Sequence, residues 1–197
     1  MSAFQIRISR RSFLQAAGLT ALAGGLAACG STAQSTAPSA SAPAYSLEDA
    51  VKAEFTGSGI TLSPENASGC TVEGTALTIA AAGTYAVSGS CADGSIQIRK
   101  GTEDVTLVLN GLTLTSTTTA PLVCGKSSGV TLAAAEGTEN TLTDGEANNK
   151  DNANASEDAE SAVVKCKDGS QVVLCGTGTL NLHAVGKNGI KSGTTEE

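Results

Sequence analysis

From residue 60 onward, apolar and polar residues alternate in short runs that are separated by glycine-containing turns. The runs are rich in Val, Ile, Leu and Thr, and they occupy residues 60–62, 77–79, 85–87, 96–98, 105–109 and 112–114. A period of two predicts half-buried β-strands. Beyond residue 46, only residues 47–55 (LEDAVKAEF) carry a weak stripe of helical period. The pattern predicts an all-β domain.

The apolar runs recur at a nearly constant interval. Val105-Thr-Leu is followed by Val130-Thr-Leu at a step of 25 residues, and Val164-Lys-Cys is followed by Ile190-Lys-Ser at a step of 26. Because different turns separate these runs, the common step indicates a repeating structural unit of about 25–26 residues.

One interval in this series is 16–17 residues too long. Val130 and Val172 are 42 residues apart, and the apolar pair at 122–123 recurs at 163–164 after a step of 41. The long interval contains residues 144–160, DGEANNKDNANASEDAE, which are nearly all acidic, amide or small. The repeat continues on both sides of this segment. We therefore interpret it as an acidic insertion into one turn of the repeat, and not as a linker between domains.

A β-repeat of this length, with several short strands per period, is typical of one coil of a parallel β-helix. Each coil leaves its inward apolar side chains uncovered until neighbours stack on it, and residues 60–193 would supply roughly five coils. The competing fold is an antiparallel sandwich of hairpins, which Asn110-Gly111 between two apolar runs indicates. A stack of hairpins does not require a common 25-residue register, so the repeat favours the β-helix.

The N-terminus carries an export pattern. Arg10 and Arg11 precede a weakly apolar run, rich in alanine and glycine, that ends in small residues before Cys29. This run is too short and too rich in glycine for a stable membrane span. The pattern resembles a twin-arginine signal peptide with a lipoprotein box over residues 1–28. It implies lipid attachment at Cys29 and a place on the outer face of the cell membrane.

The remaining chain divides into three parts. Residues 29–46 carry no charge and almost only small or turn-forming side chains, so we interpret them as a flexible tether. Residues 47–59 are expected to form an N-terminal cap region, and residues 60–197 the β-helix domain. The chain stops soon after a new coil begins near residue 187, with no capping segment visible. We therefore expect it to be truncated at its C-terminus.

Charge and composition narrow the class of partner. Without residues 1–28 the chain keeps 19 acidic and 9 basic residues, a net charge of 9 − 19 = −10. A nucleic-acid partner is disfavoured, because phosphate binding needs a basic face. Three aromatic residues and no Trp follow Cys29, which is few for sugar stacking. The other cysteines are interpreted as buried small apolar residues, with a Cys70–Cys91 disulfide as one option; they are Cys70, Cys91, Cys124, Cys166 and Cys175.

Several segments together resemble a family of bacterial extracellular carbohydrate-binding domains. They are VTLVLNGLTLTSTTTAPLVC (105–124), GTENTLTDG (137–145), the acidic insertion, GTGTLNL (176–182) and NGIKS (188–192). The resemblance covers about residues 58–193. It implies a right-handed parallel β-helix similar to that of polysaccharide lyases. It also implies bound calcium, an acidic polysaccharide such as polygalacturonate as ligand, and no catalytic role.

Calcium takes roughly six to eight oxygen ligands, and the acidic insertion is dense in carboxylates and amides. Candidate ligands within it are Asp144, Glu146, Asp151, Glu157, Asp158 and Glu160. Two further candidates, Asp168 and Asn188, occupy turns that stacked coils would bring close together. No EF-hand loop fits the insertion, and Gly193-Thr194 stands where the family pattern would place an acidic residue. A solvated acidic loop without calcium is the alternative.

These observations predict a monomeric, non-catalytic cell-surface protein that binds an acidic polysaccharide through calcium, or another cell-wall glycan. Calcium suits an acidic polysaccharide, since a cation held by protein carboxylates can also accept sugar carboxylates. A polysaccharide lyase would need a base beside the metal-acidified sugar carbon. Beyond residue 29 the chain has one arginine, Arg99, and one histidine, His183, both at ordinary strand positions. A lyase remnant is therefore the weaker alternative. A passive surface solenoid or adhesin without a glycan ligand is the other.

Overall fold

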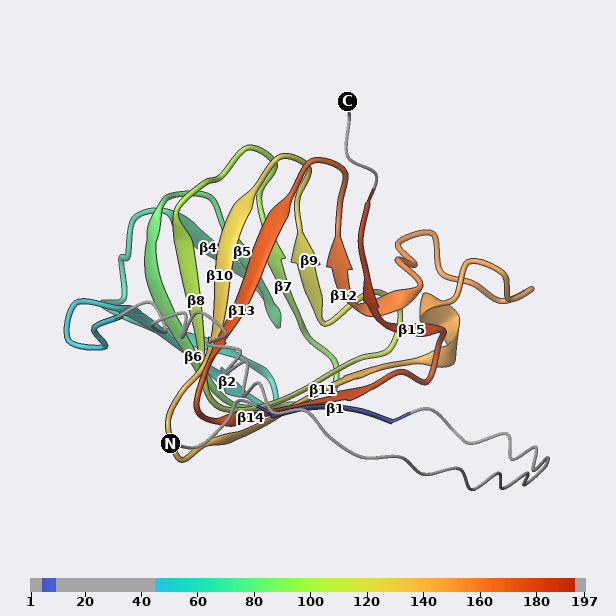
Figure 1. The fold of residues 1–197 in the computed structure, drawn as a ribbon, viewed down its shortest axis with the longest axis horizontal. Coiled ribbons are helices and arrows are strands. Elements are labelled where there is room, and N and C mark those ends of the chain that lie inside the picture. The colour runs from blue at the N-terminus through green and yellow to red at the C-terminus, as the bar shows by residue number, and fades with distance from the viewer. Residues whose placement is uncertain (1–4, 10–44, 194–197) are drawn as a thin grey trace, which may run out of the picture.

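The computed structural model describes residues 5–9 and 45–193, and the strands in these ranges form two β-sheets (Figure 1). The nine-stranded sheet contains β1 (Gln5–Ser9), β2 (Val51–Thr56), β3 (Gly59–Ser63), β6 (Gly83–Cys91), β8 (Val105–Ser116), β10 (Gly129–Ala134), β11 (Glu139–Asp144), β13 (Gln171–Gly176) and β14 (Thr179–His183). The six-stranded sheet contains β4 (Cys70–Glu73), β5 (Ala76–Ile79), β7 (Ser95–Ile98), β9 (Leu122–Cys124), β12 (Ala162–Cys166) and β15 (Asn188–Lys191). The helical element in these ranges is a 3-10 turn, η1 (Glu146–Asn148), and no helix there is long and apolar enough to cross a membrane.

Both sheets are mixed, and the prediction of an all-β chain is confirmed. The antiparallel pairs are β2 with β3 and β4 with β5, at the end of each sheet nearest the N-terminus of the domain. The other paired strands run parallel, as the step of about 25 residues predicts (Figure 1). The weak helical stripe at 47–55 was misleading. Residues 51–56 form strand β2 instead, because Ala53 and Phe55 are buried with a period of two.

The repeat places equivalent residues side by side. Val130 on β10 pairs with Val105 on β8 and with Val172 on β13, so the steps of 25 and 42 are confirmed. In the six-stranded sheet Val164 lies beside Leu122, a step of 42, and the sequence-based step of 41 was one residue too short. Two adjacent valines at 163–164 hid the register, because either one matches the apolar pattern.

Asn110-Gly111 does not form a hairpin. Both residues lie within β8, whose first part pairs with β10 and whose second part pairs with β11. Gly111 has a φ of 80°, and its N–H and that of Leu112 both donate to Oδ1 of buried Asn140, each over 2.9 Å. The left-handed glycine forms a corner within the strand. Asn140, which lies on the next repeat of the chain (called a pass below), holds this corner in place.

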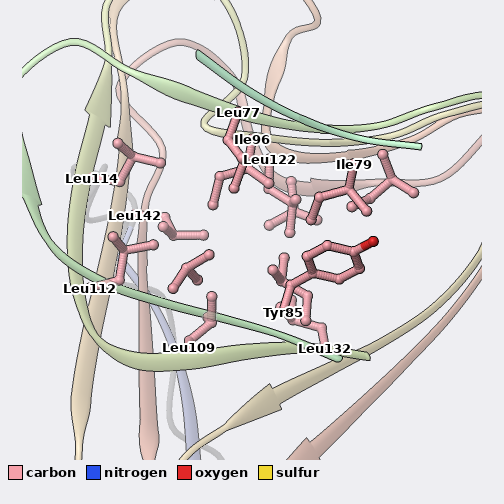
Figure 2. Packing of buried hydrophobic residues seen from close by; sticks show 14 of the residues in the cluster. Leu77, Ile79, Tyr85, Ile96, Leu109, Leu112, Leu114, Leu122, Leu132 and Leu142 are labelled. Carbon is pink, nitrogen blue, oxygen red and sulfur yellow. The ribbon is translucent and has the colours of Figure 1, made fainter. Parts of the chain in front are cut away.

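Side chains from both sheets meet in one hydrophobic core (Figure 2). Leu77, Ile96 and Leu122 project from the six-stranded sheet toward Leu109 and Leu142 of the nine-stranded sheet, and each is at most 1% exposed. Full burial of one such side chain contributes about 2 kcal/mol. The alternating apolar positions of the sequence therefore supply the core of the domain.

The five cysteines within residues 45–193 are free thiols, and four of them are buried. Their interpretation as small core residues is confirmed for those four, and the Cys70–Cys91 disulfide is absent from the described chain. Cys124 and Cys166 are neighbours in register on β9 and β12. A hydrogen bond to the Cys166 thiol, together with burial, raises the pKa of Cys124, which keeps this thiol protonated.

The outer faces of the two sheets have different neighbours. On the nine-stranded sheet, Tyr45 and Leu47 pack against an outward cluster that includes Ala86, Val108 and Ala133. The chain entering the domain therefore covers part of this face. The acidic insertion, which joins β11 to β12, lies instead beside the six-stranded sheet (Figure 1).

Candidate functional site

The acidic insertion is attached to the domain through Asp144, the last residue of β11. Asp144 is 1% exposed, and its Oδ1 accepts hydrogen bonds from the backbone N–H groups of Val185 (2.7 Å) and Gly186 (3.0 Å). Its Oδ2 accepts one from the side-chain amide of Asn148 (2.9 Å). This carboxylate therefore joins two successive passes of the chain and also holds the start of the insertion.

Asn148 holds the end of the insertion as well. It is fully buried, and its Nδ2 also donates to the carbonyl oxygen of Ala162 (2.9 Å). Its Oδ1 accepts the backbone N–H of Glu160 (2.6 Å), and its own carbonyl accepts that of Ser161 (2.7 Å). One amide side chain thus pairs both ends of the insertion, so residues 158–161 have a defined position.

The tip of the insertion forms a polar hollow of about 500 Å³ lined by Glu146, Asn152 and Asn154. Asn152 is held there because its side-chain amide donates to the carbonyl oxygen of Glu146 (2.8 Å). Nearby, Asp151 pairs with Lys187, and this hydrogen bond and charge lower the pKa of Asp151. The pair is solvent-exposed, so it adds little to stability.

A groove of about 300 Å³ separates the end of the insertion from the outer face of the six-stranded sheet. The insertion contributes Asp158 and Glu160 to its lining, and the six-stranded sheet with its adjoining turns contributes Ser95, Gln97, Thr119, Val123 and Lys167. Glu160 Oε1 and Lys167 Nζ form an ion pair over 2.7 Å, with exposed side-chain fractions of 14% and 38%. We call this the insertion groove. It gathers hydrogen-bond donors and acceptors from separate parts of the chain.

A second groove, of about 560 Å³, crosses the turns that precede β8, β10 and β13. Glu103, Asp104, Ser127, Ser128 and Gln171 are among the residues that line it. Here the hydroxyl of Ser128 is buried and has no hydrogen-bond partner within the described part of the chain. This groove lies away from the insertion.

The structure brings only some of the sequence-predicted calcium ligands together. Asp158 and Glu160 share the insertion groove. Asp144 is buried in its backbone contacts, whereas Glu146, Asp151 and Glu157 are exposed at separate points of the insertion. Within residues 5–9 and 45–193, no three His, Cys, Asp or Glu side chains are arranged to hold a metal ion.

Asp168 and Asn188 are not neighbours. Asn188 opens β15 beside Ala162, and its amide donates to the carbonyl oxygen of Ser161 (2.7 Å). Asp168 follows the far end of β12, where its carbonyl accepts the N–H of Ser127 (2.9 Å). The signal residues Arg10 and Arg11 and the lipidation residue Cys29 lie outside the described residues.

Sequence reasoning missed three residues that shape this region. Asn148 was one of several similar amides in the insertion, and nothing local distinguishes the one that is buried. Gln97 and Lys167 are ordinary outward strand or turn positions until the register places them beside Asp158 and Glu160. Lys167 is 42 residues beyond Gly125, the residue that follows β9, so extending the pairing of β9 with β12 by one residue is the signal that could have located it.

Shortening the tip of the insertion is expected to leave the fold intact. The Ser156 N–H donates to the carbonyl oxygen of Ala147 over 2.8 Å, so residues 149–155 can be replaced by Gly-Gly without moving the ends. The side-chain hydrogen bonds that are lost are exposed, except that from the Lys150 N–H to the hydroxyl of Ser161 (3.0 Å), which a glycine N–H can replace. We therefore expect the Tm to change by no more than ~2 °C in a thermal melt. Replacing residues 147–155 also removes Asn148 and should cost far more. Equal melting of the two variants would contradict the role assigned to Asn148.

Comparisons with known proteins place this arrangement in a family. A protein from Acetivibrio thermocellus described as "Carbohydrate-binding domain-containing protein" is 30% identical over 127 residues, which is 64% of this chain and 43% of that protein. A solved structure, described as the polysaccharide lyase-like protein from C. thermocellum in a gadolinium derivative, aligns with a TM-score of 0.60 at 27% identity. The alignment covers 72% of this chain and 55% of the chain in the solved structure. The chain thus spans less than half of the curated relative. The family model for carbohydrate-binding domain-containing proteins matches residues 73–195, so the chain belongs to that family.

Proposed function

We propose that this protein is a non-catalytic polysaccharide-binding protein built as a right-handed parallel β-helix. The observation that carries the proposal is the family match over residues 73–195, which covers the strands from β5 to β15 and the residues that line both grooves. The likeness to a polysaccharide lyase-like structure supports the same fold and the same class of ligand. Exposed strands that repeat at a fixed spacing suit a ligand that is itself a repeating polymer.

Non-catalytic binding suits the positions of the candidate bases. Arg99 follows β7 and His183 ends β14, and both are exposed. Neither lines the insertion groove or the second groove. A base for β-elimination must lie within hydrogen-bond reach of the sugar proton. The proposal therefore assigns the protein to binding and not to cleavage.

The ligand we propose is an acidic polysaccharide bridged by calcium. The hollow at the tip of the insertion offers one carboxylate, that of Glu146, and the amide oxygens of Asn152 and Asn154. Such oxygen donors fit calcium, and a single carboxylate is expected to give weak binding, on the order of 10⁻⁴–10⁻³ M, as in extracellular modules. A sugar carboxylate could then complete the coordination shell. The solved relative was studied as a gadolinium derivative, and Gd³⁺ is likewise a hard cation that prefers oxygen ligands.

We also propose that the protein is exported through the twin-arginine route and anchored by lipid at Cys29. This is supported by Arg10-Arg11, the following apolar run and the small residues before Cys29. A tether over residues 29–46 would then hold the binding domain outside the cell as a monomer.

Calorimetry with polygalacturonate tests this proposal. We expect binding in calcium buffer, a loss of at least tenfold in affinity on adding a chelator, and a similar loss in Glu146→Gln. Glu136→Gln is the matched control, because Glu136 is an exposed carboxylate on a turn of the nine-stranded sheet. Equal affinity with and without chelator would defeat the calcium bridge. No binding to any polysaccharide on a glycan array would defeat the function and favour a passive scaffold.

A further inference from the structure

The floor of the insertion groove is an outward strand position that is nevertheless covered. Val123 on β9 pairs with Gln97 on β7, which is exposed, and its neighbours Leu122 and Cys124 belong to the core. Val123 therefore faces outward, yet it is only 6% exposed. Since Val123 and the end of the insertion line the same groove, the insertion stands over this strand and makes a recess on an otherwise open face.

The wall of the groove is held in place before any ligand arrives. Ala159, between Asp158 and Glu160, is 1% exposed, and its N–H donates to the carbonyl oxygen of Ser156 (3.1 Å). The backbone N–H of Glu160 is bound to Asn148, which is itself bound to Asp144. A ligand contacting Asp158 and Glu160 would not have to order this segment. A prearranged wall lowers the entropic cost of binding.

The groove offers both donors and acceptors at its surface. The Lys167 ammonium has three N–H donors and the Glu160 carboxylate has several acceptor positions, so their single ion pair leaves both groups with further capacity. Gln97 adds an amide, and Thr119 adds a hydroxyl. Sugar hydroxyls donate and accept at once, so a lysine–carboxylate pair beside an amide matches them. No aromatic side chain lines this groove, so stacking contributes nothing there.

The charge and the volume of the insertion groove limit which sugars can bind in it. The groove holds two carboxylates and one ammonium, so a sugar carboxylate would meet net repulsion there. Its volume of about 300 Å³ is at the low end for small-molecule sites and leaves room for about one sugar unit. Resting on the polysaccharide binding proposed above, we infer that the insertion groove binds the hydroxyl groups of one neutral sugar unit directly, without a metal ion. The hollow around Glu146 has a different lining, so the two contacts are separable.

Nuclear magnetic resonance titration of the whole chain in a chelating buffer tests this inference. The probes are tetrasaccharides of xylose, mannose, galactose and glucose. We expect at least one to shift the side-chain amide signal of Gln97 and the backbone amide signals of residues 158–160 in a saturable way. Lys167→Met and Gln97→Ala should each weaken that binding by about tenfold, because each removes hydrogen bonds to the sugar. Gln171→Ala, which alters an equally exposed glutamine in the second groove, should bind as the unaltered chain does.

The outcomes separate this inference from the proposed function. Shifts confined to other residues, or unchanged affinity in Lys167→Met and Gln97→Ala, would overturn the groove assignment. Binding of polygalacturonate in calcium buffer without any response to neutral tetrasaccharides would also overturn it and would leave the proposed function standing. Failure of the chain to bind any polysaccharide would overturn both. An unchanged amide spectrum in each free variant shows that the fold is retained.

Discussion

Replacing Asp144 by alanine is expected to lower the free energy of unfolding by about 3–5 kcal/mol. The carboxylate is 1% exposed and accepts three hydrogen bonds, from the N–H groups of Val185 and Gly186 and from the Asn148 side chain. Alanine leaves these three donors without their partner, and the side-chain amide of Asn148 is fully buried, so water does not readily replace the carboxylate there. Urea unfolding measures the loss, and a thermal melt should show a decrease in Tm of about 10 °C.

Two variants control for the loss of charge. Glu146→Ala removes a carboxylate two residues further on that is exposed, and it should change stability by less than about 0.5 kcal/mol. Asp144→Asn keeps one acceptor for Val185 and Gly186 but sets an amide NH₂ against that of Asn148, so it should fall between the two. If Asp144→Ala unfolded at the same urea concentration as Glu146→Ala, the anchoring role would be wrong.

The same arrangement occurs two passes earlier. Oδ1 of Asp93, two residues beyond β6, accepts hydrogen bonds from the backbone N–H of Thr117 (2.9 Å) and from its hydroxyl (3.0 Å). Asp93 is exposed and Asp144 is buried, because the insertion covers the second site. A carboxylate at this corner thus links one pass to the next. At Asp144 the link also sets where the insertion leaves the sheet.

Periodicity made most of the fold predictable from sequence. Parallel pairing of equivalent residues requires a constant step, and Val105, Val130 and Val172 show that step directly. The site of the insertion followed from the same argument, because extra residues between paired strands can only loop out. The exact pairing of Leu122 did not follow, since two consecutive valines satisfied the pattern equally well.

The candidate site was much less predictable. In a segment where nearly every residue is acidic or amide, composition cannot show which side chains turn inward, and Asp144 and Asn148 were indistinguishable from exposed Asp151 and Asn154. The insertion groove depends on how the end of the insertion lies over β7 and β9, which is a contact between segments some 60 residues apart, as for Gln97 and Asp158. No local pattern carries such a contact.

Two glycines near one corner of the nine-stranded sheet differ in the space available for a side chain, because successive passes of the chain stack closely at one of them. Gly176 has a φ of 101°, and a Cβ placed there would lie 2.1 Å from the carbonyl oxygen of Ala134, its partner on β10. Gly111 has a φ of 80°, and a Cβ there would meet no atom within 4 Å. Both sites disfavour L-residues, but only Gly176 also lacks space.

Gly176→Ala is therefore expected to cost about 3–5 kcal/mol, because the left-handed backbone adds about 1–2 kcal/mol and the clash with the Ala134 carbonyl forces β10 and β13 apart. Gly111→Ala should cost only the backbone part, about 1–2 kcal/mol. Urea unfolding of both variants measures the difference, with equal m-values showing that the unfolded states are comparable. Equal losses in the two variants would mean that β13 does not pack against β10 as closely as the structure shows. A larger loss at Gly176 would trace the stability of this corner to contact between successive passes of the chain.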